Sequence, residues 1–102
     1  MDVFKHITNG FHFVYEKELG AGEEVILKMP PVSPNKRGIN DIGWQAEGDV
    51  ILYGTLSSKP EDERAIWQEI QPFDEVNKTT AYIKIVNKGT NSARVTIRAI
   101  LN

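Results

Sequence analysis

The stretch Asp49-Val50-Ile51-Leu52-Tyr53-Gly54-Thr55-Leu56-Ser57 points to the class of fold. It is rich in β-branched and aromatic residues, which are typical of strands, and a second such run follows at Ala65-Ile66-Trp67-Gln68-Glu69-Ile70. Residues 58–64 between them hold no aliphatic or aromatic side chain and include a proline, which cannot occupy a central strand. We therefore expect the two runs to form a hairpin-like unit with a long, solvent-exposed tip.

The rest of the chain repeats this alternation of short apolar runs and turn signals. Further strands are expected at residues 11–16, 24–29, 39–46, 79–86 and 93–101. The last is the most regular, and the residues expected to face the core are Ala93, Val95, Ile97, Ala99 and Leu101, in alternation with Arg94, Thr96 and Arg98. Helix is expected only as single turns, in the first ten residues and at Pro60–Arg64. The sequence thus predicts an all-β chain, an antiparallel β-sandwich of jelly-roll type with seven to eight strands and little helix.

The chain of 102 residues is expected to form one domain, residues 1–102, in which residues 1–10 are an N-terminal arm. Val3, Phe4 and Ile7 fit one face of a single helical turn with Asp2 as its N-cap. The arm is too short to build its own core, and small sandwiches leave edge strands that must be covered or paired. Docking onto its own sandwich, docking onto a neighbour and a disordered terminus all remain open. We favour the neighbour, with Val3, Phe4 and Ile7 in contacts between the subunits of a homo-oligomer.

Composition limits the classes of partner. Twelve basic and fourteen acidic residues give a net charge of −2, and the Lys and Arg residues are dispersed, whereas nucleic-acid binding requires a concentrated basic face. The N-terminus lacks the pattern of a signal peptide, and no run of 18 apolar residues occurs. We therefore expect neither a nucleic-acid nor a membrane partner, and a chain that stays in the cytoplasm unless it leaves as part of a larger particle.

No group of residues predicts catalysis or a cofactor. The chain has no cysteine, which excludes thiol chemistry and zinc-thiolate sites. His6 and His12 are too far apart for two ligands on one helical face, and the acidic residues cluster mostly in expected loops. The serines lack the Gly-x-Ser-x-Gly context of an exposed nucleophile. A protein without enzymatic activity, metal or cofactor is the expectation.

The aromatic residues leave two alternatives. Sugar-binding modules with this architecture often hold their ligands on aromatic platforms, and Trp44 or Tyr53, or the breaker-rich loop Pro30–Asn40, would suit such a site. In a small β-domain a tryptophan more often fills the core, where it buries about 150–250 Å². We expect a core position for Trp67, and for Trp44 the preference is weaker.

The second half of the chain carries blocks that resemble two groups of proteins. The blocks are Gly48–Ser57, Ile66–Ile70, Thr80–Val86, a Gly-Asn turn and Ala93–Ala99, which together span about residues 48 to 102. Their order is similar to that in small bacteriophage or prophage virion proteins, with motifs of the form W-x-x-I, Y-I-K-I and V-x-I-x-A. It is similar, more loosely, to the C-terminal half of discoidin-like, galactose-binding jelly rolls.

The virion resemblance fits better, because the chain ends with its last strand and has no secretion signal. It implies a structural protein of a capsid or tail, made in the cytoplasm of a bacterial host and located in the virion. That protein would associate with itself and with other virion proteins, and the candidate interaction residues are Val3, Phe4, Ile7, Trp44 and Tyr53. The alternative is a carbohydrate-binding module of the jelly-roll type, with a glycan as partner.

Overall fold

The computed structural model describes residues 1–7, 12–29, 39–72 and 80–101. This part of the chain consists of strands and connections without a helix, and so without a helix that is long and apolar enough to span a membrane. The strands are β1 (Asp2–Val3), β2 (Lys5–Ile7), β3 (His12–Leu19), β4 (Glu24–Lys28), β5 (Ile39–Ala46), β6 (Val50–Thr55), β7 (Gln68–Ile70), β8 (Tyr82–Asn87) and β9 (Ala93–Leu101). All seven strands expected from the sequence are present, and β1 and β2 are additional.

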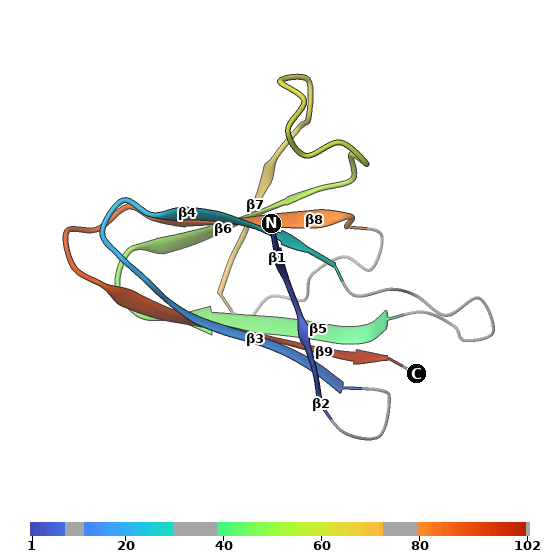
Figure 1. Cartoon of the computed structure of the whole chain (residues 1–102), viewed down its shortest axis with the longest axis horizontal. Coiled ribbons are helices and arrows are strands. Elements are labelled where there is room, and N and C mark those ends of the chain that lie inside the picture. The colour runs from blue at the N-terminus through green and yellow to red at the C-terminus, as the bar shows by residue number, and fades with distance from the viewer. Residues whose placement is uncertain (8–11, 30–38, 73–79, 102) are drawn as a thin grey trace.

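The strands form two sheets that lie face to face (Figure 1). The five-stranded sheet has the order β1-β4-β8-β6-β7, and the four-stranded sheet has the order β2-β3-β9-β5. Every pairing is antiparallel except the short parallel pairing of β1 with β4. The predicted antiparallel β-sandwich is therefore confirmed, and so is the hairpin-like unit, since β6 pairs with β7.

Side chains from the inner faces of both sheets fill the core. In β9, Val95, Ile97 and Ala99 are fully buried, while Arg94 and Arg98 are exposed on the outer face. The central strand of the other sheet, β8, shows the same alternation. The predicted direction of β9 is thus confirmed for Ala93 to Ala99, and the side chain of Leu101 lies outside the described part. The alternation of apolar and polar residues was enough to identify the inward face of β9, because one side of each sheet is buried.

Of the two tryptophans, only Trp44, for which the preference for a core position was the weaker, lies in the core. Trp44 is 3% exposed and belongs to the core cluster, where it stands opposite Ile97. Trp67 is only half-buried and lies outside that cluster, with the Lys84 ammonium 4.3 Å from its ring centroid. The prediction of a core position for Trp67 was wrong, because Trp67 precedes β7 and covers the outward side chain of Lys84.

Both predicted helical turns are also wrong. The N-terminal arm forms β1 and β2, and Pro60–Arg64 forms turns, with the Asp62 N–H donating to the Lys59 carbonyl. A single helical turn fixes several residues for one hydrogen bond and is therefore unfavourable by itself. The arm gains more by adding strands to two existing edges: β1 pairs with β4 in one sheet, and β2 pairs with β3 in the other.

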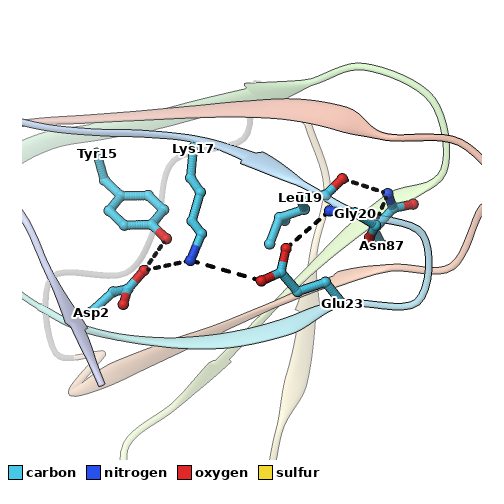
Figure 2. Close-up of polar contacts among 7 residues, drawn as sticks. All are labelled: Asp2, Tyr15, Lys17, Leu19, Gly20, Glu23 and Asn87. Atoms are coloured by element: carbon cyan, nitrogen blue, oxygen red, sulfur yellow. Dashed lines mark hydrogen bonds and ion pairs between the residues drawn. The ribbon is translucent and has the colours of Figure 1, made fainter.

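The arm therefore passes from one sheet to the other and closes the side of the sandwich where β4 and β3 lie. Figure 2 shows the polar contacts on this side. The Tyr15 hydroxyl donates to Asp2 Oδ2 at 2.5 Å, and Lys17 Nζ lies 3.4 Å from the same oxygen and 3.9 Å from Glu23 Oε2. Because Asp2 belongs to β1 and its partners Tyr15 and Lys17 belong to β3, these contacts connect the two sheets.

Asn87, at the end of β8, holds the same side of the molecule together. Its side chain is fully buried, and Nδ2 lies 3.1 Å from the Leu19 carbonyl, 3.2 Å from the Gly20 carbonyl and 2.8 Å from the Asn91 carbonyl. Asn87 Oδ1 accepts the N–H of Gly89 at 2.9 Å. One amide thus joins the β8–β9 turn to the β3–β4 turn. The close-up shows the side chain of Asn87 beside Leu19 and Gly20 of the β3–β4 turn (Figure 2). A buried amide with both ends satisfied fixes one arrangement of these turns.

Candidate functional site: an open sheet edge

The four sheet edges differ in length. β1, β2 and β7 are edge strands of two, three and three residues, whereas β5 is an edge strand of eight residues. Among the described strands, none pairs with the outer side of β5. Its sequence, Ile-Asn-Asp-Ile-Gly-Trp-Gln-Ala, contains no lysine, arginine or proline, the residues that commonly protect an edge from pairing. A long edge without these residues is a surface on which another strand can add to the sheet.

The direction of the backbone groups of β5 follows from its pairing with β9. Immediately after the strand, the Glu47 N–H donates to the Arg94 carbonyl at 3.0 Å. In an antiparallel ladder, alternate residues direct both backbone groups at the partner strand. Gln45 and Gly43 therefore bond to β9, and the N–H and C=O groups of the intervening Ile42, Trp44 and Ala46 point away from it. The ladder is regular over these residues, since its irregularity falls between Ile39 and Asp41.

The outer face beside this edge is open and carries little bulk. Gly43 and Gln45 are exposed, and a Cβ built on Gly43 meets no atom within 4 Å. A hollow of about 360 Å³ lies here, lined by Gly43, Trp44, Gln45, Thr96 and Arg98. Arg98 is directed towards Glu16, with 3.9 Å between Nη2 and Oε1. Nothing in these contacts blocks the approach of a further strand to β5.

A second exposed surface lies on the connection from β6 to β7, which projects away from the sandwich (Figure 1). Leu56 is 69% exposed and Ile66 is 82% exposed. Both line a hollow of about 590 Å³ together with Ala65 and Ile70. Two large apolar side chains on one projection cost free energy in water and are typical of a contact surface.

The structure does not bring the predicted aromatic residues together. Trp44 is in the core beneath the four-stranded sheet, whereas Tyr53 is half-buried on the five-stranded sheet, with Lys88 Nζ 5.7 Å from its ring centroid. Residues 30–38, the greater part of the predicted binding loop, lie outside the described residues. The pair Trp44 and Tyr53 therefore does not form one site.

The three apolar residues of the arm also have different surroundings. Phe4 packs against the core, with its ring centroid 6.4 Å from that of Tyr15 in an edge-to-face arrangement. Val3 is 66% exposed, and Ile7 is half-buried. The arm is paired to its own sandwich, the alternative to the contact between subunits that we favoured from the sequence.

Sequence reasoning missed the polar contacts of the arm, because they join residues that no local pattern relates. The hydrogen bond from Tyr15 lowers the pKa of Asp2 below its usual 3.8, and Lys17 adds to this effect. Burial and the hydrogen bond to Asp2 raise the pKa of Tyr15. Both shifts arise from the contacts that hold the arm to β3.

Among the described residues, no three His, Cys, Asp or Glu side chains are grouped closely enough to hold a metal ion. Comparison with protein families, with curated proteins and with solved structures finds no match for this chain. The resemblance to virion proteins thus rests on the sequence blocks between residues 48 and 102, and the open edge rests on the structure.

Proposed function

We propose that this protein is a structural protein without enzymatic activity that associates with itself by extending its β-sheets. The observation that carries the proposal is β5, an edge strand of eight residues whose outward backbone groups have no partner strand in the described part of the chain. Unpaired backbone groups on a long edge favour pairing with another chain. The other three edges, of two or three residues, offer much less.

We place this structural role in a bacteriophage or prophage virion, as a capsid or tail accessory protein made in the host cytoplasm. The support is the order of the resembling sequence blocks. The projection with Leu56 and Ile66 supports it further, because a virion component needs contacts with other proteins as well as with its own copies. The exposed pair offers such a contact on the opposite sheet from β5.

The alternative, a carbohydrate-binding module, has one observation in its favour. The outer face of the five-stranded sheet carries Tyr53 and Tyr82, with Trp67 beside them over Lys84. Sugar rings stack on free aromatic faces, however, and two of these rings already have an ammonium group above them, Lys84 over Trp67 and Lys88 over Tyr53. This arrangement makes the glycan function the weaker proposal.

Two measurements separate the proposals. Light scattering over a range of concentrations should give a mass that rises from one chain to a defined oligomer, and a glycan array should show no binding. A monomer at every concentration, together with a glycan that binds wild-type protein but not Tyr53→Ala, would overturn the structural role in favour of the alternative. Mass spectrometry of purified particles from a strain that carries the gene tests the location in a virion.

A further inference from the structure

We infer that two copies of this chain pair β5 with β5 in an antiparallel arrangement, about a two-fold axis that passes beside Trp44. This inference deepens the proposed self-association and rests on it. The two four-stranded sheets then become one continuous sheet across both copies. The argument has three steps: the direction of the backbone groups, the register that uses them and the side chains that the register brings together.

The backbone groups allow few registers. Ile42, Trp44 and Ala46 are the residues whose N–H and C=O groups point away from β9, as the Glu47 to Arg94 hydrogen bond indicates. In an antiparallel pair, two residues that both point at the partner and stand opposite each other exchange two hydrogen bonds. Pairing therefore requires that these three residues meet the same three residues of the second copy.

One register uses all of them. When Trp44 stands opposite the second copy's Trp44, Ile42 stands opposite Ala46 and Ala46 opposite Ile42, so three facing pairs exchange two hydrogen bonds each. A shift by two residues in either direction leaves one of these three residues on each strand without a facing partner, so its N–H and C=O groups stay unpaired. A shift by one residue directs the core side chains of one copy to the outer face of the other. The strand is therefore complementary to itself in one register above all others.

The side chains in this register permit close approach. On the outer face, Gly43 stands opposite Gln45 of the second copy, so no two like charges meet in the middle of the pair. Gly43 offers no Cβ, and the hollow of about 360 Å³ beside it leaves room for the neighbouring Gln45. Further along, Asp41 stands opposite the second copy's Glu47, which ends the favourable pairing at residues 42 and 46.

The geometry also favours a second copy over an unrelated strand. A two-fold pairing covers the edge of both copies at once and leaves no new edge at the joint, so the assembly closes as a dimer. The other apolar strand in this chain, the arm, is already paired with β3 and β4. Among the described residues, β5 is thus the long edge that remains, and the strand that fits it is its own copy.

Amide hydrogen exchange tests this register directly. The amides of Gly43 and Gln45 bond to β9 and should be protected at every protein concentration. The amides of Ile42, Trp44 and Ala46 should exchange rapidly at low micromolar concentration and slow by about tenfold or more near millimolar concentration, when the dimer forms. Protection that alternates along one strand and depends on concentration is specific to edge pairing.

Two variants should separate the edge from the rest of the sheet. Gly43→Lys puts a charge beside each copy's edge and should weaken the dimer by about tenfold or more. Its control, Glu18→Lys, adds positive charge to the same outer face on β3, two strands in from the edge and outside the hollow, and should leave the dimer unchanged. Ala46→Pro removes a single outward N–H, which an edge strand tolerates, and should also yield monomers with little loss of thermal stability.

The outcomes distinguish this inference from the function on which it rests. A chain that stays monomeric at near-millimolar concentration would overturn both. A chain that associates while the amides of Ile42, Trp44 and Ala46 keep their rapid exchange would overturn the β5 pairing and leave self-association in place. The same holds if Gly43→Lys and Ala46→Pro associate as tightly as Glu18→Lys.

Discussion

The two sides of the sandwich differ in whether their edge strands are paired. On the side of β3 and β4, the arm adds a short strand to each sheet, and Asp2, Tyr15 and Lys17 join the sheets by polar contacts. On the side of β5, an edge strand of eight residues has no added strand in the described part of the chain. The first side satisfies its backbone groups within one molecule, and the second leaves them available to another.

This difference shows how a small domain separates stability from assembly. The closed side carries the buried Asn87 and the arm, so changes there should alter folding. The open side contributes Trp44 to the core, but its outward backbone groups pair with no strand in the described part of the chain. A change that acts only on those outward groups should therefore alter association and leave folding intact. The predictions below test this separation, starting with the largest effect.

The largest effect is expected at Ile97, which stands between the two sides. It is fully buried, opposite Tyr15 of the closed side and Trp44 of the open side. Ile97→Ala should lower the free energy of unfolding by about 2–5 kcal/mol, as measured by denaturant titration. Thr96→Ala, on the outer face of the same strand, is the control and should change it little. Equally mild effects of the two substitutions would show that the inner face of β9 is wrongly assigned.

The next largest effect is expected at Asn87, on the closed side. Asn87→Asp keeps the shape of the side chain and replaces the donor by an acceptor facing the Leu19, Gly20 and Asn91 carbonyls. Each buried carbonyl that loses its partner costs about 1–3 kcal/mol, so the melting temperature should fall clearly. Asn91→Asp makes the same chemical change at an exposed side chain of the same turn. If that control destabilises as strongly, the Asn87 side chain is not what holds the turns together.

The strands were predictable because each is specified by its own residues. The alternation in Ala93–Leu101, the apolar run at 24–29 and the turn glycines lie within a few residues of what they determine. Gly48, in the turn between β5 and β6, adopts a positive φ of 60°, which glycine tolerates. Local patterns of this kind match the folded structure when one face of each sheet is buried. The fold class and the inward face of each strand could therefore be derived from the sequence.

The site could not be derived in the same way, because its features depend on what lies next to a strand. The sequence of β5 shows a strand but not that it ends a sheet. Asn87 directly follows the strand predicted at residues 79–86, while its side chain contacts Leu19, 68 residues away. Trp67 is a large apolar residue of the kind that often fills a core, yet it covers Lys84 on the outer face. These positions follow from the order of strands in each sheet, which residue spacing does not encode.

Removal of the arm tests whether the closed side is closed by it. A chain that starts at Gly10 lacks β1 and β2, so the edges of β4 and β3 lose their partners. We expect a lower melting temperature and, by light scattering, larger assemblies than the full chain forms, since new open edges are exposed. Val3→Ser, at a side chain that is 66% exposed, should change neither property. Association that disappears with the arm would instead mean that the arm makes the contacts between subunits.

The smallest effect is expected from the charge of Asp2, and pH reveals it. The hydrogen bond from Tyr15 lowers the pKa of Asp2 below 3.8, so the unfolded chain takes up a proton before the folded chain does. The ionised carboxylate therefore stabilises the fold above about pH 4, and this contribution is lost as the pH falls through the lowered pKa. Asp2→Asn removes the charge and should lower the melting temperature at pH 7, with the difference from wild type closing towards pH 3.

Glu18→Gln, at an exposed carboxylate on the outer face of the same sheet as Tyr15, should show no such pH-dependent difference. A gap between wild type and Asp2→Asn that stays constant from pH 7 to pH 3 would mean that shape rather than charge ties the arm to Tyr15. The arm would then close its side of the sandwich by packing and strand pairing alone.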